Sequence, residues 1–148
     1  LIVIGVFFFN PFLAVTQLPA DLATFVASLN LSPTGVLILI IFGYIVLGTF
    51  LEGFAIMVLT IPIVFPMIVG MGYDPIWFGV LLVVVLEMSL ISPPLGLNVF
   101  VVKGIAPDVP MSEIFKGVLP FWGAMLVCTA ILIIFPEIAL LLPKTMLR

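Results

Sequence analysis

Long apolar runs separated by short polar turns make up most of the chain. Residues 35–70 contain a single charged side chain, Glu52, and residues 76–102 contain only Glu87. Apolar runs of this length with so few charges are typical of helices that lie in a lipid bilayer. The pattern therefore predicts an all-α membrane protein.

The composition indicates the same class. Of the 148 residues, 65% are hydrophobic and 7% are charged, and histidine is absent from the sequence. A soluble domain carries about 25% charged residues, so this chain lacks the side chains that cover a water-facing surface. Without a basic cluster, we exclude nucleic acid as a partner. Without histidine, Ser-His nucleophile pairs and the H-E-x-x-H zinc motif are also excluded, and we do not expect an enzyme.

The first 34 residues divide into two segments. Residues 1–18 are apolar and about long enough for a membrane segment, and we interpret them as a transmembrane helix truncated at its start. In residues 19–34, apolar side chains recur at helical spacing after Pro19 and Asp21, which predicts a short interfacial helix. The chain begins with Leu1 rather than methionine, and we expect it to be a piece of a longer protein.

Residues 35–70 have a length that suits neither one membrane crossing nor two. As one straight helix, these 36 residues would be roughly 54 Å long. The hydrocarbon core is about 30 Å thick, and two crossings need about 40 residues and a turn. The only charge and two glycines lie in residues 48–53, so we predict a re-entrant hairpin with its tip there and arms too short for a full crossing. One long, tilted and kinked helix is the alternative.

Residues 76–102 form the second long apolar run, which the sequence Ser-Pro-Pro-Leu-Gly interrupts. We predict a discontinuous transmembrane helix that is broken at residues 92–96. Residues 103–116 are polar enough for a connector. Residues 117–142 are apolar and long enough for a final transmembrane helix.

The double proline points to a polar site within the membrane. A proline has no N–H and displaces the carbonyl four residues earlier, so Pro93 and Pro94 are predicted to free two adjacent carbonyls. These belong to Ser89 and Leu90, and in hydrocarbon they need water, a donor or a cation. The hydroxyls of Ser89 and Ser92 lie nearby, and an oxygen-only set suits a hard cation such as sodium. A proline kink that serves only packing is the alternative.

The second half of the broken helix offers an anion site. Its first N–H groups follow Gly96, and such half-helix N-termini bind anions in secondary transporters. We take Gly53, Gly96 and Asn98 as candidate substrate-binding residues. Glu87 is a functional candidate because it is an intramembrane carboxylate. Since it is not on the face of the two serines, we favour a structural or interface role for it.

Both tryptophans are expected near the membrane surface. Trp77 and Trp122 lie near the starts of their apolar runs. Aromatic side chains at such positions anchor helices at the lipid–water interface.

Three stretches of this chain resemble a known family. These are LGTFLEGFAIMVLTIPIVFPMIVGMGYDPIWF, the directly following GVLLVVVLEMSLISPPLGLNVFVVKGIA, and then GVLPF. They closely resemble the C-terminal part of the large membrane subunit of TRAP transporters, the tripartite ATP-independent periplasmic transporters. The resemblance covers nearly the whole chain. It implies the second inverted repeat of an elevator-type secondary transporter, with a re-entrant helical hairpin and a broken transmembrane helix.

The resemblance also implies a function and partners. Members import organic acids such as C4-dicarboxylates or sialic acid together with sodium. They receive the acid from a periplasmic substrate-binding protein, and a small membrane subunit flanks the large one in the lipid bilayer. We therefore expect a multi-pass protein of the inner membrane of a bacterium or archaeon.

In the family, a sodium site lies between the hairpin tip and the broken helix. By resemblance it maps onto Gly48, Ser89, Ser92 and Leu95. The family more often has Asp at position 52, Gly at position 89 and Thr at position 92. The serine at position 89 adds a side chain where the tip would approach the helix closely.

Two other functions stay open. A non-transporting membrane anchor or assembly subunit would tolerate apolar substitution of the oxygen-bearing residues. An intramembrane enzyme that uses Glu52 or Glu87 as an acid or base is the weaker reading, because no second catalytic group is placed near either. Orientation is undetermined, since the chain has two basic residues on each side of the last helix.

Overall fold

The computed structural model describes residues 31–93 and 96–146, and within residues 1–30 only 4–5, 11–12, 15–17, 21, 24–25 and 28. The helices are α3 (Pro33–Phe50), α4 (Gly53–Gly70), α5 (Pro75–Leu90), α6 (Leu97–Ile105), α7 (Met111–Ile134) and α8 (Glu137–Met146). No strand occurs among the described residues, so the predicted all-α class is confirmed. The helices predicted in residues 1–34 fall largely outside the described residues.

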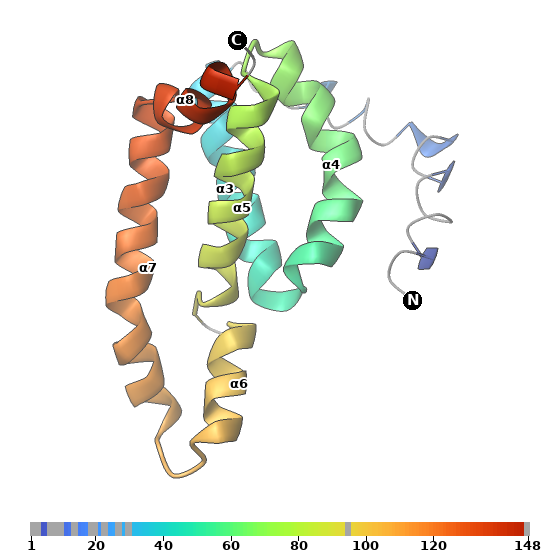
Figure 1. The fold of residues 1–148 in the computed structure, drawn as a ribbon. Coiled ribbons are helices and arrows are strands. Elements are labelled where there is room, and N and C mark those ends of the chain that lie inside the picture. The colour runs from blue at the N-terminus through green and yellow to red at the C-terminus, as the bar shows by residue number, and fades with distance from the viewer. Residues whose placement is uncertain are drawn as a thin grey trace.

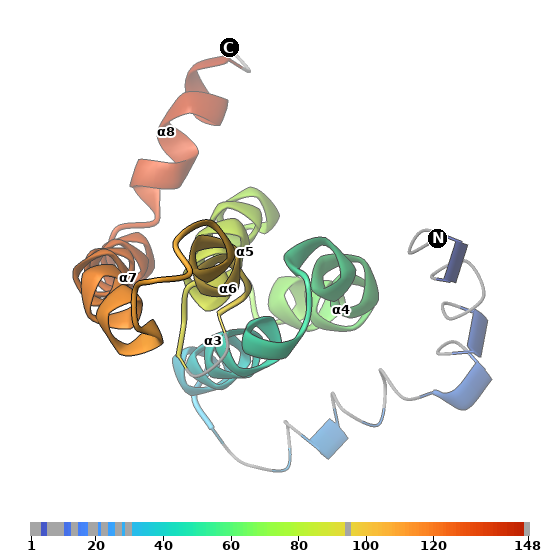
Figure 2. The same ribbon diagram turned by 90° about the horizontal axis from the view of Figure 1, so that it is seen from below.

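Helix α5 is the centre of the bundle. α3 and α4 form a hairpin, α5 runs antiparallel to α4, α6 continues in the direction of α5, and α7 returns beside both (Figure 1). α5 contacts α3, α4, α6, α7 and α8, and Figure 2 shows it surrounded by these helices. Its buried side chains form half of the core cluster: Trp77, Phe78, Leu81, Leu82, Val85 and Leu86.

Three of the described helices are long and apolar enough to cross a membrane: α3, α4 and α7. Few of their side chains are buried inside the bundle, and in α7 the buried share is only 11%. A helix that is apolar on its outer side as well is stable in lipid and not in water. The fold is therefore that of a multi-pass membrane protein.

The hairpin arms are longer than the sequence indicated. α3 and α4 contain 18 residues each, or about 27 Å. They are longer because α3 begins at Pro33, capped by the Ser32 side chain, and because Glu52 caps α4 directly after the turn. Arm length alone therefore gives no argument for a re-entrant hairpin.

The position of the hairpin tip bears more directly on whether the hairpin crosses the whole bundle. The turn between α3 and α4 lies at the level of the interruption between α5 and α6, while α6 and the first part of α7 extend beyond it (Figure 1). α7 has 24 residues, about 36 Å, whereas each arm measures about 27 Å. The tip thus turns back before the far end of the bundle.

The last apolar run forms two helices. The structure differs here from the predicted connector at 103–116 and the predicted single helix at 117–142. α6 continues to Ile105, α7 begins at Met111, and α8 is a separate helix from Glu137. α7 ends at Ile134 because Pro136 cannot donate the next helical hydrogen bond.

A buried hydrogen bond joins α5 to α7. Nε1 of Trp77 donates to the carbonyl oxygen of Leu132 at 2.7 Å, and the Trp77 side chain is 2% exposed. The carbonyl is available because Pro136, four residues later, has no N–H. Trp77 is therefore a core residue, and the prediction that it anchors the protein at the interface is wrong.

Trp122 also differs from the prediction. It lies near the middle of α7 rather than at the start of that helix. Its Nε1 is buried and has no hydrogen-bond partner among the described residues. The two tryptophans are thus a pair for comparison: the indole N–H of Trp77 has an acceptor, and that of Trp122 has none among the described residues.

The first testable prediction concerns this pair. Trp77→Phe leaves the buried Leu132 carbonyl without its donor, which costs about 1–3 kcal/mol. We expect a clearly lower thermal unfolding midpoint of the full-length protein in detergent. Trp122→Phe is the control, because it removes an N–H that has no acceptor, and its midpoint should stay unchanged or rise. Equal losses in both variants would contradict the role of the hydrogen bond.

Candidate functional site

The hairpin tip touches α5 through Gly48 and Ser89. A Cβ built on Gly48 would overlap the Cβ and Oγ of Ser89 and lie 3.6 Å from its Cα. Both residues are buried, and Ser89 is 0% exposed. The missing side chain at position 48 makes room for the side chain at position 89. The approach of hairpin and helix is therefore tight in spite of the serine.

The end of α5 is a compact turn of polar groups. Oγ of Ser89 donates to the carbonyl of Leu86 at 2.5 Å, and Oγ of Ser92 lies 3.5 Å from the carbonyl of Pro93. The N–H of Ser92 donates to the carbonyl of Ser89 at 3.1 Å. The Ser89 carbonyl therefore has a protein donor, one of the three kinds of partner expected for it, and it keeps a second lone pair. Ser92 is 4% exposed.

Gly96 closes the interruption between α5 and α6. Its φ is +35°, a conformation that residues with a side chain rarely adopt. A Cβ on Gly96 would lie 3.1 Å from the carbonyl oxygen of Ser92. The chain thus folds back onto the end of α5, and glycine is required there for both reasons.

Helix α6 begins without a side-chain cap. The N–H groups of Val99 and Phe100 donate to the carbonyl of Gly96, and none of the described side chains caps the helix. An uncapped N-terminus carries a partial positive charge. Asn98 lies in this first turn and is exposed.

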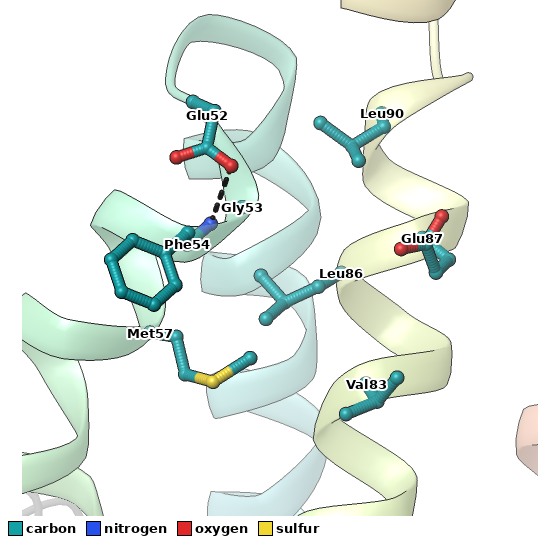
Figure 3. Close-up of a pocket in the computed structure, with 8 residues that line it drawn as sticks. All are labelled: Glu52, Gly53, Phe54, Met57, Val83, Leu86, Glu87 and Leu90. Carbon is teal, nitrogen blue, oxygen red and sulfur yellow. Dashed lines mark hydrogen bonds between the residues drawn. The ribbon is translucent and has the colours of Figure 1, made fainter.

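A pocket of about 240 Å³ lies between the hairpin tip and α5 (Figure 3). Its lining consists of Glu52, Gly53, Phe54, Met57, Val83, Leu86, Glu87 and Leu90. The Glu52 carboxylate accepts the N–H groups of Phe54 and Ala55 at 2.9 and 3.0 Å, which caps α4. Glu87 lines the same pocket from α5, so two carboxylates belong to one pocket.

The described lysines are engaged elsewhere. Lys103 donates to backbone carbonyls at 2.7 Å. Lys116 and Lys144 pair with glutamates on their own helices at 2.9 and 2.7 Å. In residues 31–93 and 96–146, Glu52 and Glu87 therefore have no basic partner for their charges.

The described part of the chain does not bring together three or more His, Cys, Asp or Glu side chains that could hold a metal ion. The oxygens that these residues offer at the tip are backbone carbonyls and hydroxyls, which are donors that hard cations accept. The residues present fit such a group, because buried hydroxyls and the turn at the end of α5 lie beside Gly48.

The predicted site residues are placed as follows. The structure brings Gly48 against Ser89, and Gly96 against the backbone of Ser92. Gly53 is buried in the pocket wall beside Leu90. Asn98 lies on α6 at the surface. Pro93 lies within the interruption, while Pro94 and Leu95 lie outside the described residues.

Sequence reasoning missed three polar residues on the hairpin, Thr49, Tyr44 and Thr60. Thr49, next to Gly48, is 5% exposed, and its Oγ1 donates to the carbonyl of Val46 at 2.7 Å. The hydroxyls of Tyr44 and Thr60 share a hydrogen bond of 2.7 Å that joins the hairpin arms. The available signal was the presence of hydroxyl side chains in apolar runs that otherwise hold few polar residues.

The fold and this pocket define a helical multi-pass membrane protein with an interrupted helix facing a hairpin tip. Residues 1–138 match the model of the family described as tripartite ATP-independent periplasmic transporter, DctM component. The chain therefore belongs to this family of TRAP transporter large permeases, which are transport proteins rather than enzymes. The resemblance inferred from the sequence is confirmed.

Named relatives agree with the family assignment. The sialic acid TRAP transporter large permease protein SiaM of Vibrio cholerae is 34% identical over 147 residues, 99% of this chain and 34% of that protein. The C4-dicarboxylate TRAP transporter large permease protein DctM of Pseudomonas aeruginosa is 34% identical over 143 residues, 97% of this chain and 33% of that protein. The isethionate TRAP transporter permease protein DctMQ of Oleidesulfovibrio alaskensis is 31% identical over 130 residues, 88% of this chain and 20% of that protein. The chain thus spans about a third of the length of the first two relatives.

The second prediction tests the contact at the tip. Gly48→Ala forces a Cβ into Ser89, and overpacking of this kind costs about 1–3 kcal/mol. We expect a lower thermal unfolding midpoint of the full-length permease, and partial recovery when Ser89→Gly is added. Gly43→Ala is the control, because it lies on the same helix and a Cβ there meets nothing within 4 Å. A loss with Gly48→Ala that Ser89→Gly does not reduce would contradict the contact.

The third prediction concerns the cap of α4. Glu52→Ala removes the acceptor for two N–H groups, and loss of an N-cap costs about 0.5–2 kcal/mol. Glu52→Asp keeps a good capping side chain and should retain most of the stability. We expect hydrogen exchange of the Phe54 and Ala55 amides to accelerate in Glu52→Ala only. Equal exchange in both variants would show that Glu52 does not cap the helix.

Proposed function

We propose that this chain is part of the membrane domain of a sodium-coupled secondary transporter that imports organic acids. It would form the second of two inverted repeats in an elevator-type permease. The observation that carries the proposal is the tight contact of the hairpin tip with the end of α5, at Gly48 and Ser89. A re-entrant hairpin that meets a broken helix is the usual architecture of a midplane transport site.

The depth of this contact supports a transport site. Residues 117–136 carry no charged side chain, and at about 1.5 Å per residue they span roughly 30 Å, the thickness of the hydrocarbon core. Ser89 lies in the last turn of α5, roughly 21 Å from the start of that helix. Oxygen atoms at this depth are shielded from bulk water, so a bound ion or substrate would gain from them.

Sodium fits the groups at the tip. The candidate ligands are oxygens of Gly48, Ser89, Ser92 and Leu95, which include no soft donor. The unpaired charges of Glu52 and Glu87 in the adjoining pocket further favour a cation over an anion at this place. Sodium bound at the tip would also reduce the repulsion between these carboxylates and an acidic substrate. That effect is the physical basis we propose for coupling.

An organic acid fits the other side of the interruption. The relatives are named as permeases for sialic acid, C4-dicarboxylates and isethionate, all of which are organic acids. The uncapped N-terminus of α6 is a favourable place for a carboxylate or sulfonate group. Gly53, Gly96 and Asn98 are the residues of this chain that we assign to the substrate.

Partners follow from the family. We expect a periplasmic substrate-binding protein that delivers the acid and a small membrane subunit beside the permease, in a bacterial or archaeal inner membrane. The remaining two thirds of a permease of this family would supply the first repeat.

The fourth prediction tests the proposed function. Ser92→Ala removes a buried hydroxyl beside the tip, and we expect the sodium concentration for half-maximal uptake to rise about tenfold, or ~1.4 kcal/mol. The assay is uptake of the organic acid by the full permease, reconstituted in vesicles with its small subunit and binding protein. Ser112→Ala is the matched control, because Ser112 is exposed on the first turn of α7.

Two outcomes would count against the proposal. If sodium dependence is the same for Ser92→Ala and the native protein, the tip is not the sodium site. If uptake also persists when Ser89 and Ser92 are both replaced by apolar residues, the chain acts as a membrane anchor or assembly subunit instead.

A further inference from the structure

Helix α8 does not continue the direction of α7. It leaves the end of the bundle sideways, as Figure 2 shows, after the turn at Phe135 and Pro136. Two contacts fix this direction. Leu140 is 8% exposed and belongs to the core cluster, and the Trp77 N–H occupies the Leu132 carbonyl at the end of α7. The angle between the helices is therefore set by packing.

The turn places α8 at the boundary of the membrane. Residues 117–136, between Lys116 and Glu137, are uncharged and span roughly 30 Å, which is the thickness of the hydrocarbon core. The turn between α4 and α5 lies at the same end of the bundle (Figure 1). That turn holds the exposed Asp74 and Tyr73, residue types that suit the interface.

The residues of α8 divide into three faces. In a helix each residue is rotated by about 100° from the one before it, and this places the three faces roughly 120° apart around the axis. The face toward the bundle is buried or half-buried and holds Ala139, Leu140 and Pro143. The polar edge holds Glu137 and Lys144, whose side chains pair at 2.7 Å and stay exposed. The remaining face is apolar and 57–76% exposed, and its members are Ile138, Leu141, Leu142 and Met146.

One polar side chain lies within the apolar face of α8, but its hydroxyl is satisfied within the helix. Thr145 lies among these residues, and its Oγ1 donates to the carbonyl of Leu142 at 2.8 Å. The hydroxyl hydrogen is thus already bonded. The face also continues the outer surface of α7, where Ile134 is 67% and Phe135 is 58% exposed.

We propose that α8 lies in the plane of the membrane surface and that lipid covers its apolar face. Three faces need three environments, and only the lipid–water boundary beside the bundle supplies protein, hydrocarbon and water together. Leu142 would lie in the acyl region, and the pair of Glu137 and Lys144 would lie in water. Because Leu140 and Trp77 join α8 and α7 to α5, this surface helix holds the central helix at a fixed depth.

The test uses spin labels on the full-length permease in phosphatidylcholine vesicles. All native cysteines, including Cys128, are first replaced by serine. Single labels are then placed by Leu142→Cys and Lys144→Cys. Collisions with oxygen, which concentrates in lipid, and with a nickel chelate, which stays in water, are measured by electron paramagnetic resonance. A label by Val127→Cys on the exposed side of α7 gives the mid-membrane reference.

We expect the Leu142 label to collide several-fold more with oxygen than with nickel, and the Lys144 label to show the reverse. Ile138→Cys, one turn before Leu142, and Glu137→Cys, two turns before Lys144, should repeat this difference. A Leu142 label open mainly to nickel would place the face in water, and a label shielded from both would place another protein segment on it. Either result overturns the proposal. Since no uptake is measured, the result is independent of the proposed sodium coupling.

Discussion

The approach of Gly48 to Ser89 is the constraint on which the arrangement of the bundle depends. It brings the end of α3 against the last turn of α5 without space for one further methyl group. The hairpin tip is therefore held at the level where α5 stops, and the pocket with Glu52 and Glu87 forms beside it. If either residue were larger, the tip would move away from α5, and the pocket, the turn and α6 would lose their common position.

The chain interrupts its helices with proline, and the structure supplies a donor for two of the carbonyls that lose their helical partner in this way. The carbonyl of Ser89 receives the N–H of Ser92, and that of Leu132 receives the indole N–H of Trp77. In lipid, such groups need partners within the protein. The helix breaks are thus stable local structures. The polar atoms that stay available to a ligand are at the tip and at the start of α6.

The charged side chains lie at different depths along the bundle. The described lysines and their partners lie toward the ends of the membrane-length helices. Glu52 and Glu87 lie between these levels, at the pocket, without a basic partner among the described residues. This separation supports the proposed binding of a cation and an organic acid near the tip. It also supports a boundary role for α8, whose charged pair lies where the uncharged stretch ends.

The sequence by itself determined the class of protein, the family, the turn of the hairpin and the interruption after α5, but not the ends of the later helices. Apolar runs, Pro93 and Pro94, and the glycines at the tip are local signals, and each acts through the backbone of its own segment. Only the tertiary structure decided that Gly48 meets Ser89, that Trp77 is buried against Leu132, and that α8 turns away from α7. These depend on which surfaces pack together across long separations in the chain. A uniformly apolar sequence does not encode such pairings in its pattern, because facing lipid and facing protein require the same kinds of side chain.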